Sequence, residues 1–286
     1  MLFFPNARIT LGLHVKAKRR DGFHDIETVM LPIGMYDALE IVPAIDNQTK
    51  IILSGTPIPG DPYENLVMRA LKLIQKEMPF QPAINSEAPE MLHIYLRKGI
   101  PAGSGLAGGS ADGAFMLKIL NEYFKLNLTP GQLKTMAAKL GSDCPFFLQN
   151  KAMVVRGRGE ILETINTPDL SGLHLIIIVP PIGINTSEAY RLITPEPERV
   201  SIKEILAMPF AAWQENLKND FESVLFKTYP YLKEIKNRLI GQGAVYASLS
   251  GSGSALYGLF KDAAVLSSLR KDFEDCLTGH YQILES

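Results

Sequence analysis

The stretch "GIPAGSGLAGGSAD" (residues 99–112) places five glycines between an apolar run, "MLHIYL" (91–96), and a long helical pattern. Glycine loses more backbone entropy on folding than other residues, so a chain keeps it where a tight turn, close packing or a ligand requires bare backbone. A helix that begins inside or just after this stretch would aim its unpaired N–H groups and positive dipole end at the loop. With hydroxyl donors at Ser104 and Ser110, the stretch predicts a phosphate-binding loop.

Two common phosphate-binding motifs do not fit this loop. "GSGLAG" (103–108) matches the GxGxxG pattern of dinucleotide-binding folds, which also requires an acidic residue about 20 positions later, after a second strand. The nearest acidic candidate, Glu122, still lies inside the same helical pattern. No Lys-Ser or Lys-Thr pair follows the glycines, so the P-loop pattern fails as well. We therefore expect a phosphate loop of a third kind.

The composition narrows the class of protein. The chain has 286 residues, of which 46% are hydrophobic and 21% charged, as in soluble globular enzymes. A net charge of −1 argues against nucleic acid as a partner. The most apolar stretch (173–184) is broken by two prolines and is too short to span a membrane, and the N-terminus lacks the pattern of a signal peptide. Cys144 and Cys276 have no metal-binding spacing and suit a reducing compartment, so we expect a cytoplasmic protein.

Hydrophobic periodicity predicts an α+β chain. Alternating and β-branched runs predict strands, and apolar residues at helical spacing predict helices. In the first part we expect strands at 7–15, 26–33, 37–44, 50–55 and 91–99, helices at 64–78, 105–124 and 129–141, and a hairpin at 152–165. The first four strands are expected to form a meander of neighbours.

The polar, proline-containing segment "NTPDLSG" (166–172) is the best candidate boundary, and it predicts domains at 1–165 and 166–286. The pattern beyond it predicts strands at 173–179, 244–249, 254–260 and 281–284, helices at 186–193, 230–240 and 262–276, and a looser helical region at 201–227. The glycine cluster at 248–260 is typical of a hairpin when taken alone. Together with the first glycine loop, it suggests a second wall of backbone near a site.

Several polar residues have both a structural and a chemical interpretation. Asp143, just before the apolar run "CPFFL", either caps a helix or accepts the proton of an attacking hydroxyl. Phe23 and His24 lie beside a turn and are either core residues or ligand contacts. Asn185 and Glu188 have capping-box spacing, which favours a simple helix start. The segment "KNDFE" (218–222) is equally open.

Taken together, the motifs identify a family. "PNARITLGL" (5–13), "PAGSGLAGGSADGA" (101–114) and "SLSGSGSAL" (248–256), in this order, resemble the three motifs of the GHMP small-molecule kinase superfamily. The segments "DGFH" (21–24), "GSDCPFF" (141–147), "NTSEAY" and "NDFE" are similar to those of members that phosphorylate a cytidine diphosphate-linked polyol. The resemblance runs over nearly the whole chain.

The resemblance implies a fold and an activity. It implies an N-terminal domain like domain 2 of ribosomal protein S5 and a ferredoxin-like C-terminal domain. It also implies an ATP- and Mg²⁺-dependent enzyme that phosphorylates an alcohol, with Asp143 as catalytic base. No protein ligand for Mg²⁺ is assigned, and Ser110 is the one candidate. Phe23 would stack on the cytosine, His24 would read its edge, and Thr186 would lie near the substrate. The residues implied to wrap the ATP phosphates are Pro101, Ala102, Gly103, Ser104, Gly105, Leu106, Ala107, Gly108, Gly109, Ser110 and Ala111.

The chain departs from the family pattern at two positions. Arg8 stands where a lysine is usual, and Thr10, predicted here as a substrate contact, stands where an asparagine is usual. Arginine keeps the positive charge and can form a forked pair with Asp143, but it cannot relay a proton. Because phosphoryl transfer depends mostly on positioning and charge, we expect Arg8 to act as a catalytic residue and activity to survive.

Three other functions remain open. A sister kinase of homoserine or mevalonate type would share the three motifs, although its substrate has no base for Phe23 to stack on. A nucleotide-binding homologue without full activity would explain the loss of the usual lysine. A dinucleotide oxidoreductase is a distant third. The sequence does not indicate the oligomeric state.

Overall fold

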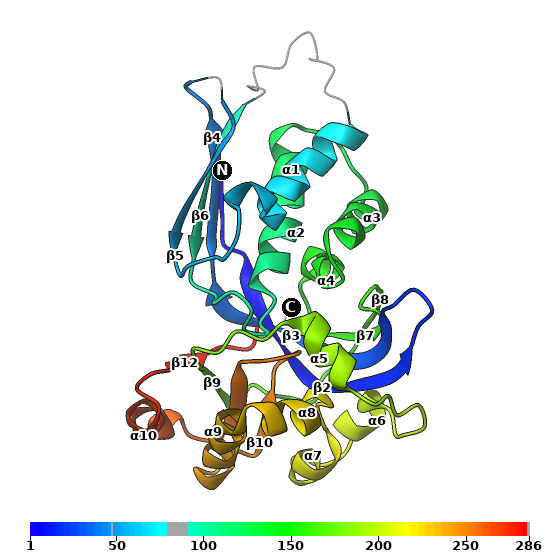
Figure 1. Cartoon of the computed structure of the whole chain (residues 1–286), viewed down its shortest axis with the longest axis vertical. Helices are drawn as coiled ribbons and strands as arrows, with labels where there is room; N and C mark the ends of the chain where they lie inside the picture. The colour runs from blue at the N-terminus through cyan, green and yellow to red at the C-terminus, as the bar shows by residue number, and fades with distance from the viewer. Residues whose placement is uncertain (47, 79–90, 285–286) are drawn as a thin grey trace. The chain divides into compact units, whose positions relative to one another are not determined.

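The computed structural model describes residues 1–46, 48–78 and 91–284, and its chain divides into two compact units. The first unit comprises Met1–Ala7, Met35–Ala102 and Ala107–Asn150. The second comprises Arg8–Gly34, Gly103–Leu106 and Lys151–Ser286. Both units contain helices and strands, as the α+β prediction requires (Figure 1). Both contain segments that are far apart in sequence, and the domain division after residue 165 stays a prediction.

The first unit is built on a four-stranded sheet of order β1-β4-β6-β5. Its strands are β1 (Leu2–Phe3), β4 (Ala38–Pro43), β5 (Lys50–Gly55) and β6 (Leu92–Lys98). The expected meander is wrong, because β6 lies between β4 and β5, antiparallel to the first and parallel to the second. The connection from β5 to β6 contains a helix, and such a crossover joins parallel strands, whereas a meander needs tight turns.

Helices cover one face of this sheet (Figure 1). They are the 3₁₀ helix η1 (Pro62–Glu64), α1 (Leu66–Glu77), α2 (Gly108–Tyr123), α3 (Pro130–Leu140) and α4 (Cys144–Gln149). Asn65 caps α1, and Thr129 and Gln132 form a capping box on α3, which ends at Gly141 as predicted. On the side of the sheet that faces the core, the side chains of β4 and β6 are fully buried; they are Leu39, Ile41, Ile94 and Leu96.

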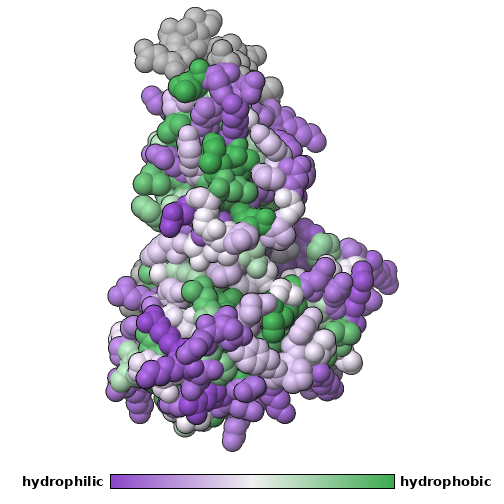
Figure 2. Space-filling model, turned by 60° about the vertical axis from the view of Figure 1, so that its left-hand side comes forward, coloured by the Kyte–Doolittle hydropathy of each residue, from purple (hydrophilic) through white to green (hydrophobic). Residues whose placement is uncertain are grey.

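The other face of the sheet is exposed. Tyr95 lies between Glu40 and Ile52 in the strand register, and Tyr95 and Ile52 are both exposed. Figure 2 shows apolar surface gathered in this part of the molecule. The sheet therefore has one face covered by helices and one solvated face, which is common where a sheet contains antiparallel pairs.

The second unit contains two further sheets. The first has the order β2-β3-β7-β8, with β2 (Asn6–Lys18), β3 (His24–Tyr36), β7 (Met153–Gly157) and β8 (Ile161–Thr164). The hairpin predicted at 152–165 is confirmed, since β7 and β8 pair antiparallel. In the β2–β3 turn, the Arg19 guanidinium pairs with Asp21 and Asp25.

The second sheet has the order β10-β11-β9-β12, and all its pairs are antiparallel. Its strands are β9 (His174–Val179), β10 (Tyr246–Leu249), β11 (Leu256–Phe260) and β12 (Leu277–Tyr281). The last strand lies before its predicted position at 281–284. The preceding helix is also shorter than expected, with η2 (Ala263–Val265) followed by α10 (Leu266–Asp272). The position of the last strand is therefore set by its pairing with the apolar strand β9, and not by the local sequence preference on which the prediction was based.

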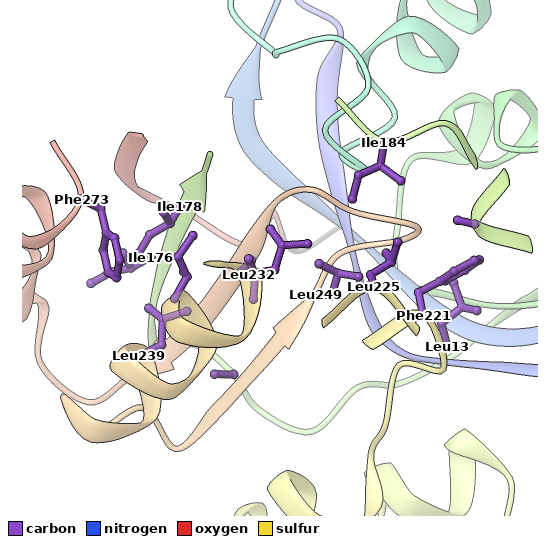
Figure 3. Packing of buried hydrophobic residues seen from close by; sticks show 14 of the residues in the cluster. Leu13, Ile176, Ile178, Ile184, Phe221, Leu225, Leu232, Leu239, Leu249 and Phe273 are labelled. Carbon is purple, nitrogen blue, oxygen red and sulfur yellow. The ribbon is translucent and has the colours of Figure 1, made fainter. Parts of the chain in front are cut away.

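The helices of this unit enclose its core. They are α5 (Thr186–Leu192), α6 (Ile202–Leu206), α7 (Phe210–Asn216), α8 (Phe221–Thr228) and α9 (Pro230–Gly241), so the looser helical region consists of three short helices. Figure 3 shows Ile176 and Ile178 of β9 near Leu232 and Leu239 of α9. No helix in the described ranges combines the length and the apolar character that crossing a bilayer requires.

Gly12 shapes the middle of β2. Its φ is +64°, a left-handed conformation that favours glycine, and the Thr28 hydroxyl donates a hydrogen bond to its carbonyl oxygen. A Cβ atom at this position would lie 2.7 Å from Cδ1 of Leu217. The absence of a side chain therefore allows β2 to approach the segment that leads into α8.

Replacing Gly12 with alanine tests this close approach. We expect Gly12→Ala to lower the free energy of unfolding by about 2–4 kcal/mol, from backbone strain and overpacking together. Gly22→Ala is the control, because Gly22 has φ +86° but no described atom within 4 Å of its Cβ position. That variant should lose only about 1 kcal/mol. Equal losses in urea denaturation would contradict the steric argument.

Candidate functional site

The first glycine loop joins β6 to α2. Gly103, Gly105 and Ala107 all have positive φ, and this backbone path delays the start of α2 to Gly108. In the described structure no side chain caps α2, and its first turn carries no acidic residue. The amide N–H groups at a helix start lack intrahelical partners and attract anions. The loop is therefore followed directly by a helix start of the kind that attracts anions, and its binding of phosphate stays a prediction.

The two glycine loops pack backbone against backbone. A Cβ on Gly105 would lie 2.2 Å from the Ser250 carbonyl oxygen and 2.7 Å from that of Gly253. The Ala255 amide donates to the Ser104 carbonyl at 2.8 Å, and the Ser250 hydroxyl donates to the Gly105 carbonyl at 2.9 Å. The prediction that the second loop forms a backbone wall beside the first is confirmed.

Arg8 and Thr10 connect β2 to both loops. The Arg8 guanidinium donates to the Gly105 carbonyl and lies 3.5 Å from the Ser250 hydroxyl oxygen. The Arg8 amide donates to the Leu106 carbonyl at 3.0 Å. The Thr10 hydroxyl accepts the Gly251 amide at 2.8 Å. The two positions that depart from the family pattern thus hold the loops together, a role that sequence reasoning did not foresee.

The "NDFE" segment supports the second loop from behind. The side-chain amide of Asn219 donates to the carbonyls of Leu249 and Gly251 at 2.9 and 2.8 Å. Glu222 accepts the Leu249 amide at 3.0 Å and pairs with Lys236 at 2.6 Å. The role of this segment could not be decided from the sequence, and the structure shows that it holds the backbone of the second glycine loop. The run of polar residues at the start of a helix was the feature of the sequence that could have indicated this role.

Asp143 occupies the N-cap position of α4, but its side chain makes no capping hydrogen bond within the described structure. Its carboxylate is partly exposed and lies in the same unit as the start of α2. Burial, and then the charge of Asp143, raise the pKa of the neighbouring Cys144 thiol to about 12, while a hydrogen bond with Ser110 opposes this. Asp143 and Ser110 therefore both lie near the Cys144 thiol, and the structural interpretation of Asp143 as a helix cap does not account for its side chain.

A second group of predicted residues surrounds α5. His24 stacks on Tyr190 with ring centroids 4.9 Å apart and planes at 19°. Burial, followed by the charge of Lys18, lowers the pKa of His24, so the ring is neutral at pH 7. A neutral imidazole has one donor and one acceptor nitrogen, which suits it to reading the edge of a base.

Phe23 and Thr186 complete this second group. Phe23 is 47% exposed, and the Arg158 guanidinium lies 5.0 Å from its ring centroid. The Thr186 and Ser252 hydroxyl oxygens are 2.9 Å apart, which places the start of α5 beside the second glycine loop. Asn185 caps α5 through the amides of Ser187 and Glu188, so this predicted helix start is confirmed.

Tyr190 was missed in the sequence. It follows Thr186 by four residues and therefore shares its face of α5. That spacing was the signal that could have found it.

A pocket of about 430 Å³ lies elsewhere in the second unit. Arg199, Lys218, Asp220 and Phe226 are among its lining residues, and none of the predicted site residues is. The Arg199 guanidinium pairs with Asp220, which also accepts the Val15 amide at 2.6 Å. Arg199 and Asp220 thus serve the packing of β2, whereas Asn219 and Glu222, which also line the pocket, bond the second glycine loop. None of the lining residues belongs to either glycine loop.

The comparisons with known proteins agree with these motifs. The GHMP kinase N-terminal domain model matches residues 65–151, and the GHMP kinase C-terminal model matches residues 201–275. The 4-diphosphocytidyl-2-C-methyl-D-erythritol kinase of Bacteroides fragilis is 43% identical and covers 96% of both chains. The enzyme of that name from Parabacteroides distasonis is 39% identical over 99% of this chain and 100% of its own.

Solved structures share the fold. A 4-(cytidine 5'-diphospho)-2C-methyl-D-erythritol kinase superposes with a TM-score of 0.76 at 28% identity, covering 98% of this chain and 99% of its own. The mevalonate kinase of Methanococcus jannaschii superposes with a TM-score of 0.71 at 12% identity, covering 100% and 98%. At 12% identity, the mevalonate kinase shows only that the fold is shared. The Bacteroides and Parabacteroides enzymes are 43% and 39% identical over nearly the whole chain, which is enough to show the family. This chain, with its two-domain α+β fold, belongs to the GHMP kinase family.

Proposed function

We propose that this chain transfers the γ-phosphoryl group of ATP to the 2-hydroxyl of 4-diphosphocytidyl-2-C-methyl-D-erythritol, a step of the non-mevalonate route to isoprenoid precursors. The observation that carries the proposal is the near-full-length identity of 39–43% with kinases that bear this substrate in their names. The homoserine and mevalonate alternatives are supported by fold alone, at 12–18% identity.

The ATP phosphates are proposed to bind at residues 101–111. Three features support this: the positive φ angles of the loop, the uncapped start of α2 and the hydroxyls of Ser104 and Ser110. Mg²⁺, bound to the phosphates, would neutralise their charge. No protein ligand of the ion is assigned, and Ser110 is the one candidate for it.

Asp143 is proposed as the general base. As the 2-hydroxyl oxygen forms its bond to the γ-phosphorus, its proton passes to the Asp143 carboxylate, and the bond to the β–γ bridging oxygen breaks. Arg8 is proposed to supply fixed positive charge beside the loops, because its guanidinium already bonds the Gly105 carbonyl. Its pairing with Asp143 stays a prediction. Arginine cannot take the proton, so that role remains with the carboxylate.

The cytidine end is proposed to lie at Phe23 and His24. Phe23 offers an exposed ring for stacking, and His24 stacks on Tyr190 and is neutral because burial lowers its pKa. Thr186 and Thr10 are proposed as substrate contacts, although the Thr10 hydroxyl also accepts the Gly251 amide. A cytoplasmic location is proposed from Cys144 and Cys276, which are both free thiols.

The base assignment is tested by Asp143→Asn. We expect kcat to fall about 10²- to 10⁴-fold with little change in either KM, because proton acceptance is lost while shape is kept. ADP release in a coupled assay with the cytidyl substrate measures this. Asp169→Asn removes an exposed carboxylate elsewhere and is the control. Near-wild-type turnover of Asp143→Asn would remove the assignment.

The role of Arg8 is tested by a pair of variants. Arg8→Lys keeps the charge but loses the fork to Gly105 and Ser250, so kcat/KM for ATP should fall by only about tenfold. Arg8→Met loses the charge and should cost about 10²- to 10³-fold. If the unaltered protein binds ATP without transferring phosphate, and Arg8→Lys restores transfer, the non-catalytic alternative is correct.

Recognition of the base is tested by Phe23→Ala. We expect KM for the cytidyl substrate to rise about tenfold, because one base–aromatic stack is lost, while KM for ATP stays unchanged. Phe4→Ala is the matched control, since Phe4 is also an exposed phenylalanine, at 56%, outside the site. If Phe23→Ala raised KM for ATP and left KM for the cytidyl substrate unchanged, the cytosine would not bind at Phe23.

A further inference from the structure

A buried ionic cluster lies in the first unit, outside the predicted site residues. Lys98, the last residue of β6, pairs with Asp37 and with Oδ2 of Asp112, the latter at 2.7 Å. Asp37 lies between β3 and β4, and Asp112 lies in α2, four residues after its first residue. The exposed fraction of each side chain is 3% or less. Three ionisable groups from three parts of the chain are thus removed from water together.

The cluster does not balance its charge when every group is ionised. One ammonium against two carboxylates leaves one negative charge in the interior, which is costly without further partners. Oδ1 of Asp112 is buried and has no hydrogen-bond partner in the part of the chain that the structure describes. Burial, and then the charge of Asp37, raise the pKa of Asp112 to about 8, while Lys98 opposes this. A proton on Asp112 makes the cluster neutral.

The cluster joins the two ends of the first glycine loop. Oδ1 of Asp37 accepts the amides of Gly99 and Ile100 at 2.6 and 2.9 Å, where the chain leaves β6. At the other end, a Cβ on Gly108 would lie 3.2 Å from Nζ of Lys98. Asp112 holds the same ammonium from within α2. The start of the loop is therefore linked to Lys98 through Asp37, and the helix that follows the loop is linked to the same lysine through Asp112.

We propose that Asp37, Lys98 and Asp112 are positioning residues that set the geometry of the phosphate loop, and that Asp112 is protonated when ATP binds. The proposal rests on the proposed ATP site at 101–111. Loss of the proton at alkaline pH adds a negative charge near the start of α2, where anions are to bind. The charged groups that act on Asp112 are Lys98 of β6 and Asp37 before β4.

The proposal predicts a pH-dependent affinity that Asp112→Asn removes. Asparagine keeps the shape of the side chain and an oxygen for Lys98 but cannot ionise. For the wild type, we expect the Kd for ATP to rise about tenfold as pH rises through about 8, as expected for one added charge about one helical turn from the start of α2. For Asp112→Asn, the Kd should stay flat over the same range. Isothermal titration calorimetry with ATP and Mg²⁺ at a series of pH values measures both.

Stability provides a second readout. A carboxyl group whose pKa is raised by folding stabilises the protein fully in acid, and this contribution is lost as pH rises toward the folded value near 8. Asp112→Asn should therefore flatten the dependence of the melting temperature on pH. A merely structural cluster would show this change in stability while the Kd for ATP kept its wild-type pH dependence, and that result would overturn the proposal.

Two further variants separate the causes. Asp37→Ala removes the acceptor for Gly99 and Ile100 but leaves Lys98 balanced by Asp112. Below pH 8, KM for ATP should therefore rise about tenfold over the wild type, while KM for the cytidyl substrate is unchanged. An unchanged KM for ATP would contradict the positioning role of Asp37. Glu27→Gln removes a buried carboxylate that pairs with Lys16 and should keep the wild-type pH dependence. If the wild type binds no ATP at any pH, the proposed function itself fails.

Discussion

The close approach of two glycine loops is the constraint on which the site depends. Gly105 lies so near the backbone of Ser250 and Gly253 that any Cβ atom there would overlap a carbonyl oxygen. Main-chain atoms, with no side chains between them, therefore form the contact. This arrangement leaves amide groups near the start of a helix, where an anion gains from both hydrogen bonds and the helix dipole.

Backbone packed in this way needs side chains that hold it in register. Asn219 and Glu222 bond the strand end and turn of the second loop, and Thr10 bonds the Gly251 amide. Arg8 joins this set, because its guanidinium spans the Gly105 carbonyl and the Ser250 hydroxyl. A planar fork with several donors can serve two acceptors and still carry a full charge. This gives a physical reason to expect that arginine can serve where the family usually has lysine.

Burial distinguishes the ionic groups that position the loop from those that do not. The pairs of Arg19 with Asp21 and Asp25 are largely exposed, and such pairs contribute little to stability. Lys98 and its two partners are almost fully removed from water, so solvent screens the ion pairs among them much less. A change in one partner is therefore felt at both ends of the loop.

The sequence alone determined the local features and the family. The glycine spacing predicted the phosphate loop, the capping signals predicted α3 and α5, and the three motifs identified the GHMP kinases. These features depend on residues that are close together in the chain, whose geometry follows from local sterics and hydrogen bonding.

Only the tertiary structure decided what depends on distant residues. It placed β6 between β4 and β5, stacked Tyr190 on His24, and brought Asp37 and Asp112 to Lys98. It also moved the last strand to 277–281, because the edge of β9 offered pairing there. In each case the partners lie far apart in the sequence, and the free energy comes from burial and pairing that no local pattern encodes.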